Sequence, residues 1–348
     1  MSRLRFWHPV LCARDLPSNR PVAVRVDGHD LAIFRGDDGT LGALEDKCVH
    51  RRLKLSVGKV IDNKLCCAYH GWSFTTDGAG ESPGTPKLHA CARSYDCAEA
   101  CGAIWVRERG GTQPLPDLHR GFEDWSFAGC VINPIKAPLA LLLDNFAEIE
   151  HTVAAHPQFG IEISQASKAV IKLDATPESF AVRCHGPSKP PPLATRLLAW
   201  TWAGDLFHSD FTFRFDPPRS AVTHYWTEPG AGRERMAKYF LYHYFVPRDE
   251  QESMVVTFGY LRSRWPGMDW IARRMGWFVR AKIKQTIDED AWLLEQMADY
   301  DTGLDGMKLS RFDKVLGMIR ERLRTVYDDD GPDVHGECSA ICAAQSPC

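Results

Sequence analysis

Two short cysteine and histidine clusters near the N-terminus constrain the fold of this chain more than any other feature. Sixteen residues separate Cys48-Val-His50 from Cys67-Ala-Tyr-His70. Each pair is short enough for one turn between strands to present both side chains to a single metal group. The residues between the pairs allow the second loop to lie opposite the first. The motif therefore predicts a metal site shared by two loops of a small β domain.

Two cysteines and two histidines in this arrangement can bind either an iron–sulfur cluster or a single metal ion. In a [2Fe–2S] cluster of mixed ligation, Cys48 and Cys67 would bind one iron, and His50 and His70 the other. A structural zinc site is the main alternative, although zinc motifs more often pair two closely spaced cysteines. Cys66 competes with Cys67, but Cys67 alone has the two-residue spacing to His70. Alternation along a strand places Cys66 on the opposite face.

The length and pattern of the chain predict two domains of an α+β fold. A chain of 348 residues exceeds the usual size of a single hydrophobic core. Short strand-like runs separated by turn residues fill the first third, and the Gly- and Pro-containing segment 110–116 indicates a linker. We therefore expect an antiparallel β domain over residues 1–120 and a second domain over 121–327. Residues 328–348 are polar and contain cysteines, and we expect a flexible tail.

The second domain combines strands with helices at both ends. Residues 136–156 have apolar positions at helical spacing and end before Pro157. Residues 161–262 contain six strand-like runs that suit a larger antiparallel sheet, and 270–299 are rich in helix formers. The aromatic residues of 185–275 suit either a mostly apolar pocket or ordinary core packing.

A second pair of histidines lies in the first of these helical segments. His151 and His156 are five residues apart, which is about 140° around an ideal helix. A break near His156, consistent with Pro157, is needed to bring the two imidazoles together. By itself the pair is weak evidence, because histidines are often packed in ordinary cores.

The sequences CVHRR, LSVGKV and CAYHGWSF resemble the two ligand loops of Rieske domains in the ring-hydroxylating oxygenase family. The resemblance is strong over residues 5–110 and follows the family pattern over 136–300. Members usually have Pro at the position of Val49 and small residues at Arg52 and Lys54. These departures lie on the loop surface, where a partner would dock, and leave the four cluster ligands unchanged.

The resemblance implies a mononuclear Fe(II) held by His151, His156 and a distant carboxylate, which leaves coordination positions open for O₂ chemistry. The family pattern of an acidic pair, an apolar stretch and Glu-Gln matches Glu289-Asp290 and Glu295-Gln296. Asp290 is therefore the predicted carboxylate, and Asp288 is the alternative in the same acidic run.

Two further residues of the helical segment match family positions that act on this iron. Glu148 matches the acidic residue that bridges an iron histidine to a Rieske histidine of a neighbouring subunit, where most members have Asp. Electrons would then pass through His70, Glu148 and His151. Asn145 matches an Asn near the iron in monooxygenase-type members.

The family fold pairs a Rieske domain with a helix-grip (START-like) catalytic domain of antiparallel sheet and long helix, assembled as a homotrimer. The resemblance implies the terminal oxygenase of a Rieske monooxygenase that hydroxylates or demethylates a small, mostly apolar substrate. No Gly-x-Gly-x-x-Gly fingerprint is present, so an NAD(P)H-dependent reductase, with or without a ferredoxin, would supply electrons. A Rieske electron carrier without a catalytic iron, and a ligand-binding helix-grip protein, are the alternative classes.

Composition narrows the partners and the location. A net charge of −3 argues against nucleic acid, and no apolar run is long enough for a signal peptide or a membrane span. We therefore expect a cytoplasmic protein whose twelve cysteines are metal ligands or free thiols. His335 and three tail cysteines offer a further metal site, although free thiols are the simpler interpretation: Cys338, Cys342 and Cys348.

Overall fold

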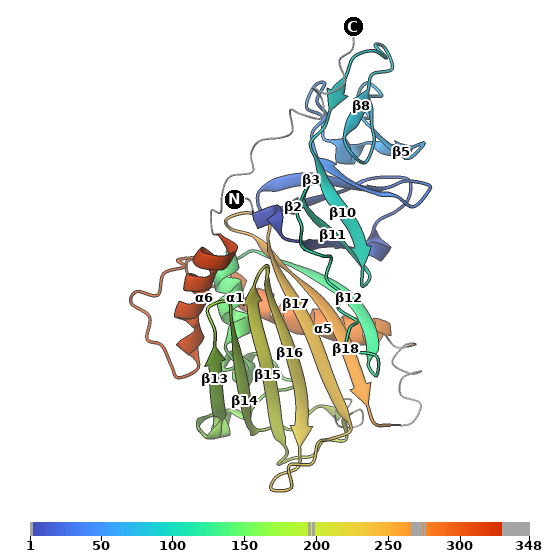
Figure 1. Cartoon of the computed structure of the whole chain (residues 1–348). Helices are drawn as coiled ribbons and strands as arrows, with labels where there is room; N and C mark the ends of the chain where they lie inside the picture. Colours follow the sequence, from blue (N-terminus) through green and yellow to red (C-terminus); the bar gives the residue numbers. More distant parts are fainter. Residues whose placement is uncertain (1–2, 194–195, 197–198, 266–273, 275, 329–348) are drawn as a thin grey trace. The chain divides into compact units, whose positions relative to one another are not determined.

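The computed structural model describes residues 3–193, 196, 199–265, 274 and 276–328 (Figure 1). The chain forms two compact units, which divide between Asp117 and Leu118. The domain limits 1–120 and 121–327 remain a proposal about independent folding. Residues 329–348, with the tail cysteines, lie outside the described part of the chain. No helix in the described ranges is long and apolar enough to cross a membrane.

The first unit contains two antiparallel sheets. The larger has the order β1-β11-β10-β4-β3-β2, and the smaller runs from β5 to β9 in sequence order. The strands of the larger sheet are β1 (His8–Cys12), β2 (Val22–Val26), β3 (His29–Arg35), β4 (Leu41–Glu45), β10 (Ser94–Ala100) and β11 (Ala103–Glu108). Those of the smaller sheet are β5 (Lys59–Ile61), β6 (Lys64–Cys66), β7 (Ser73–Phe74), β8 (Ala79–Glu81) and β9 (Ala90–Cys91).

A compact apolar cluster holds the smaller sheet together. Phe34, Leu65, Phe74 and Trp72 pack in one buried cluster that includes the thiols of Cys48 and Cys67. Because buried side chains of this size are costly to truncate, the cluster fixes the ends of the strands that carry the cysteines. The ligand loops therefore begin from rigid positions.

The second unit is a seven-stranded antiparallel sheet with a long helix across one face (Figure 1). The sheet order is β12-β18-β17-β16-β15-β14-β13, and helix α5 (Gly276–Glu295) packs on β12 and β18. The strands are β12 (Ser126–Ile135), β13 (Val170–Ala175), β14 (Ser179–Pro187), β15 (Leu206–Phe215), β16 (Pro218–Thr227), β17 (Ala237–Pro247) and β18 (Ser253–Ser263). The α+β class, with a long helix on an antiparallel sheet, is confirmed.

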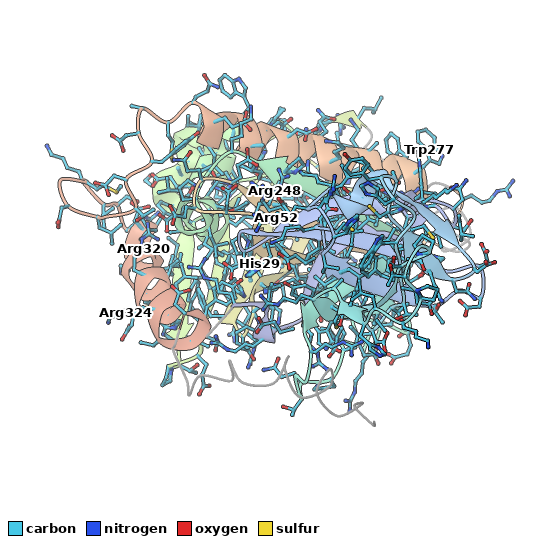
Figure 2. The ribbon with its side chains drawn as sticks, turned by 90° about the horizontal axis from the view of Figure 1, so that it is seen from above. His29, Arg52, Arg248, Trp277, Arg320 and Arg324 are labelled. Atoms are coloured by element: carbon cyan, nitrogen blue, oxygen red, sulfur yellow. The ribbon has the colours of Figure 1, made fainter. Side chains whose placement is uncertain are left out.

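The described part of this unit also contains three shorter α-helices. They are α1 (Leu139–Ala147), α2 (His151–Ala155) and α6 (Leu316–Arg322). The leucines of α1 are buried, and its Asp144 accepts hydrogen bonds from the guanidinium of Arg320, at 2.7 Å for the Nη1 bond. Arg320 lies on α6 (Figure 2). This ion pair joins the two helices at the side of the sheet.

Two elements were not expected from the sequence. Strand β12 contains Gly129, Asn133 and Pro134, which weaken a strand pattern, yet it forms the edge of the sheet, where Pro is tolerated. Helix α6 is short and follows a polar stretch without a clear start signal. Both are stabilised by tertiary packing more than by local propensity.

Candidate metal centres and active site

The two predicted cluster loops share one backbone design. In each loop the cysteine N–H donates to the carbonyl of the fifth residue on, at 2.8 Å in the first loop and 2.7 Å in the second. The cysteine carbonyl accepts from the N–H of the fourth residue on, at 2.8 and 3.1 Å. The first loop uses Cys48, Arg52 and Leu53, and the second uses Cys67, Gly71 and Trp72. The repeated turn places the two cysteines in equivalent positions, with the histidine two residues later in the first loop and three residues later in the second.

The side chains of these loops divide into a buried pair and an exposed pair. The thiols of Cys48 and Cys67 are buried and interact with each other. The imidazoles of His50 and His70 are exposed, with ring centroids 4.6 Å apart, and Trp72 stacks on His50. A buried sulfur pair and an exposed nitrogen pair are the donor set that a [2Fe–2S] cluster of mixed ligation requires.

Cys66, the rival ligand, points elsewhere. Its Sγ lies 3.8 Å from the carbonyl oxygen of Lys64, and the buried cluster around Cys48 includes Cys67 but not Cys66. The structure therefore brings together the four residues that the spacing selected. Their binding of the cluster remains a proposal.

The second predicted centre brings three side chains together from two distant segments. Donor atoms of His151, His156 and Asp290 lie within 4.8 Å of one another. Asp290 Oδ1 is 3.5 Å from His151 Nε2 and 3.2 Å from His156 Nε2. Helix α2 ends at Ala155, and His156 adopts extended backbone angles (φ −106°, ψ 110°). Because the helix ends before His156, the two imidazoles can approach the same point although they are five residues apart.

Each imidazole is oriented by its own carboxylate. His151 Nδ1 lies 2.7 Å from Glu148 Oε1, and His156 Nδ1 lies 2.9 Å from Glu289 Oε2. When Nδ1 carries the proton and donates to a carboxylate, the Nε2 lone pair is free to bind a metal. Glu148 was singled out from the sequence. Glu289 was quoted only as the neighbour of Asp290, and no sequence signal separates it from other acids of the run.

The remaining candidates lie outside the triad. Asp288, the alternative carboxylate, is exposed and accepts hydrogen bonds from Asn133 at 2.6 Å and Lys284 at 2.8 Å. Asn145 lies on α1, and its Nδ2 is buried with no hydrogen-bond partner in the described ranges. The structure therefore favours Asp290 over Asp288, and the role of Asn145 stays a prediction.

The burial, hydrogen bonding and charge of the triad residues fit a divalent metal ion. Asp290 is buried, yet its Oδ1 has no hydrogen-bond partner among the residues described, and it faces two imidazole nitrogens. Burial lowers the pKa of His151, but the hydrogen bond and charge of Glu148 and the charge of Asp290 outweigh it and raise that pKa. The surroundings thus favour a positive charge. The separations of 3.5 and 3.2 Å between Asp290 Oδ1 and the two Nε2 atoms would allow one metal ion to bind all three residues through bonds of about 2.1 Å.

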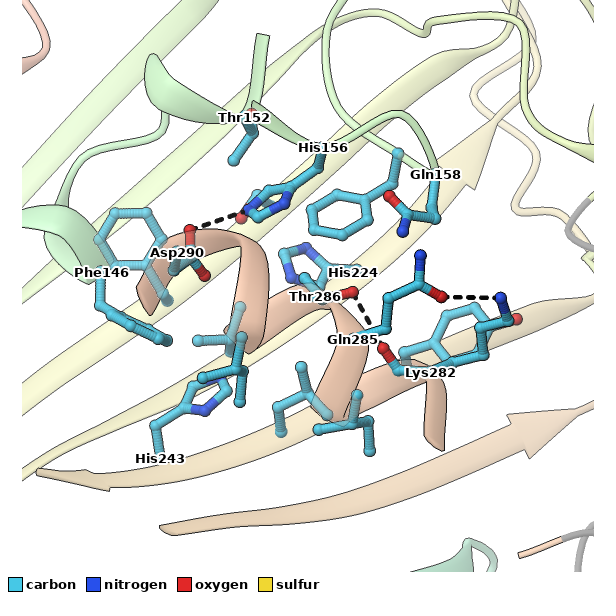
Figure 3. A pocket seen from close by; sticks show the side chains of 18 of the residues that line it. Phe146, Thr152, His156, Gln158, His224, His243, Lys282, Gln285, Thr286 and Asp290 are labelled. Carbon is cyan, nitrogen blue, oxygen red and sulfur yellow. Dashed lines mark hydrogen bonds and ion pairs between the residues drawn. The ribbon is translucent and has the colours of Figure 1, made fainter. Parts of the chain in front are cut away.

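A cavity of about 400 Å³ adjoins the triad (Figure 3). Aromatic and aliphatic side chains dominate its wall, including Phe146, Phe211 and Leu241. Two histidines from neighbouring strands also line it. Burial lowers the pKa of His224 to about 3 and that of His243 to about 4, so both are neutral near pH 7. Sequence reasoning missed both, because a histidine in a strand gives no local sign that it faces a cavity.

Comparisons with known proteins agree with this arrangement. Residues 6–95 match the Rieske [2Fe-2S] domain, and residues 135–328, more than half of the chain, match the vanillate O-demethylase oxygenase C-terminal domain. The chain therefore belongs to the Rieske oxygenases, in the monooxygenase and demethylase branch. The two domains imply a [2Fe–2S] cluster and a mononuclear iron.

Individual relatives are more distant. The 4beta-methylsterol monooxygenase of Methylococcus capsulatus is 26% identical over 84% of this chain and 80% of its own length. The methylxanthine N1-demethylase NdmA of Pseudomonas putida is 38% identical over 52% of this chain and 58% of its own length. A structure of dicamba monooxygenase with 3,6-dichlorosalicylic acid shares the fold, with a TM-score of 0.73 and 18% identity over 94% of this chain and 98% of the other. The chain spans less than a third of the chloroplast protein TIC 55 of Arabidopsis thaliana.

Proposed function

We propose that the chain is the terminal oxygenase of a multicomponent Rieske monooxygenase, which hydroxylates or oxidatively demethylates a small, mostly apolar organic molecule. One observation carries the proposal: the donor atoms of His151, His156 and Asp290 converge beside a largely apolar cavity. Two histidines and one carboxylate are the ligand set of non-haem iron oxygenases. A protein that only carried electrons would need neither the triad nor the cavity.

The residues of the chain have separate tasks in this reaction. The iron, when bound by the triad, supplies the activation of O₂ that organic side chains cannot provide. Glu148 and Glu289 hold the two imidazoles with Nε2 toward Asp290. The aromatic wall of the cavity excludes water and orients the substrate bond that reacts. The substrate's position, rather than a protein nucleophile, then determines which C–H bond is oxidised.

The exposed basic residues around the cluster loops are evidence that a separate electron-donor protein docks there. Arg51, Arg52 and Lys54 are exposed next to the exposed imidazole of His50. A basic surface at this edge would steer an acidic reductase or ferredoxin domain toward the cluster. We infer that NAD(P)H-derived electrons enter here.

Transfer from cluster to iron would use a second copy of the chain in a homotrimer. His151 also borders a surface groove with Trp292, which is 62% exposed. The side chain of Glu148 is 15% exposed and contacts His151. Its carboxylate would bridge His151 to a histidine of another subunit. These features support the inter-subunit path, which a cross-linking experiment between Glu148 and His70 positions would test.

Metal analysis tests the oxygenase proposal directly. Anaerobically purified protein should contain about three irons and two acid-labile sulfides per chain, because a two-iron cluster and one further iron are present. O₂ consumption should require the third iron, whether or not the substrate is oxidised at the same time. A ratio of two irons to two sulfides that added Fe(II) does not change would contradict the oxygenase and favour the electron carrier.

A further inference from the structure

Several polar atoms in the wall of the cavity have no partner within the protein. Gln158 Oε1, Ser209 Oγ and His224 Nδ1 are buried and lack hydrogen bonds to any residue that the structure describes. Buried polar atoms in folded proteins are nearly always paired, because leaving one unpaired costs free energy. Three unpaired atoms around one cavity indicate that a bound molecule completes them.

His224 is held so that only its edge is available to a ligand. The rings of Phe159 and Phe207 lie 5.2 and 5.5 Å from the imidazole, centroid to centroid. Ser209 is directly opposite His224 across the β15–β16 pair, so both side chains lie on the same face of the sheet. Figure 3 shows the His224 ring among the side chains of the cavity wall. The site therefore combines aromatic surface with one edge that can donate or accept.

Among the described residues of the same wall, no buried cation is available to a negatively charged ligand. Of the charged residues around the cavity, Glu148 and Asp290 belong to the metal site. The third is Lys282, which is exposed, and its Nζ donates to Gln285 Oε1 at 2.9 Å. Burial keeps His224 neutral, with its pKa lowered to about 3. Burying an anion without a paired cation is strongly unfavourable, whereas an uncharged polar group needs only hydrogen bonds.

We propose that the cavity selects an uncharged ring compound whose amide or hydroxyl group is held by His224, with Gln158 and Ser209 completing its hydrogen bonds. Such a group both donates and accepts, which matches an amide oxygen, a hydroxyl and an imidazole edge. The remaining ring surface packs against the aromatic wall. This substrate class rests on the proposed oxygenase function but concerns binding, which can be measured without turnover.

Calorimetric titration of the oxidised, iron-loaded protein without reductant tests the proposal. The probes are 4-methoxybenzamide and 4-methoxybenzoate, which have nearly the same shape and differ in charge. The amide should bind at least about tenfold more tightly, because the carboxylate loses its hydration while the charge of the iron is already balanced by the carboxylates of Asp290, Glu148 and Glu289. Equal or tighter binding of the benzoate would overturn the proposal, as would failure of the amide to bind.

Variants locate the polar contact. His224→Phe should weaken amide binding about tenfold. The affinity for 4-methylanisole, which lacks the amide, should change by less than about twofold. Ser209→Ala is a smaller change and should weaken the amide about threefold, so the proposal stays testable if the first variant misfolds. His185→Phe is the matched control, since His185 stacks on His208 on the opposite face of the sheet.

The outcomes separate this inference from the proposed function. If His224→Phe and Ser209→Ala both leave amide binding unchanged, the hydrogen-bonding site is wrong even when the iron content supports an oxygenase. If the third iron is absent, the oxygenase proposal fails, while the ranking of amide over benzoate, measured on the protein as purified, still decides which class of ligand the cavity binds.

Discussion

The two metal centres of this chain are built in opposite ways. The cluster loops are local: each cysteine and its histidine lie within four residues of each other, at exposed turns of a small sheet. The iron triad is assembled from α2 and α5, with more than a hundred residues between them, in a buried setting. The local centre exposes its nitrogen ligands to partners. The distant centre is shielded and borders the cavity, as chemistry with reactive oxygen requires.

Removing one ligand from each centre should produce the largest and most distinct effects. Cys67→Ala should abolish the visible absorption of the cluster and all turnover, because a thiolate ligand cannot be replaced by water. His156→Ala should lower turnover at least about a thousandfold, while cluster absorption and two irons per chain remain. Absorption spectra and iron analysis check both.

Cys66→Ala is the matched control for the first centre, and it should leave the spectrum unchanged. If Cys66→Ala bleaches the cluster instead, the assignment of Cys67 is wrong. If His156→Ala also removes the cluster, the two centres are not independent.

The contrast also explains how much could be predicted from the sequence. The cluster ligands were recognisable because their spacing and the adjoining loop sequence are contiguous. His151 and His156 could be named, but their meeting depends on the end of α2, and the selection of Asp290 over Asp288 depends on which face of α5 is buried. The roles of Glu289 and His224 come from three-dimensional packing alone, so no periodicity or motif identifies them.

Glu289 is expected to have the next largest effect, as a positioning residue for His156. Glu289→Gln should weaken Fe(II) binding about 10- to 100-fold, because loss of the carboxylate frees the imidazole to rotate and change tautomer. Equilibrium dialysis of Fe(II) at constant cluster content measures this without turnover. Glu289→Asp should restore part of the affinity.

Asp288→Asn is the control for Glu289, since it removes an adjacent but exposed carboxylate on the same helix. It should leave Fe(II) affinity unchanged within about twofold. If Asp288→Asn lowers the affinity as much as Glu289→Gln, the effect reflects local charge and not the orientation of His156.

The basic surface of the first centre should give an intermediate effect. Arg51→Glu with Lys54→Glu should slow reduction of the cluster by an acidic ferredoxin-type donor about tenfold at low salt, because steering is lost. The difference should shrink as ionic strength rises. Stopped-flow bleaching of the cluster measures the rate.

Lys308→Glu changes charge on the other unit and should leave that rate unchanged. A donor whose rate is insensitive to Arg51→Glu and Lys54→Glu would mean that electrons enter the cluster elsewhere.

The smallest effect concerns the residue with positive φ, which differs between the two cluster loops. Arg52 has φ 59° at the position where the second loop has Gly71 with φ 70°. A non-glycine residue in this region costs about 1–2 kcal/mol, and the greater freedom that glycine gives the unfolded chain offsets part of the gain from removing that cost. Arg52→Gly should therefore stabilise the cluster-containing protein by about 0.5–1 kcal/mol, seen as a slightly higher midpoint for thermal loss of cluster absorption. Arg51→Gly, one residue earlier, should give no gain. A lower midpoint for Arg52→Gly would mean that the arginine side chain contributes contacts that outweigh its backbone strain.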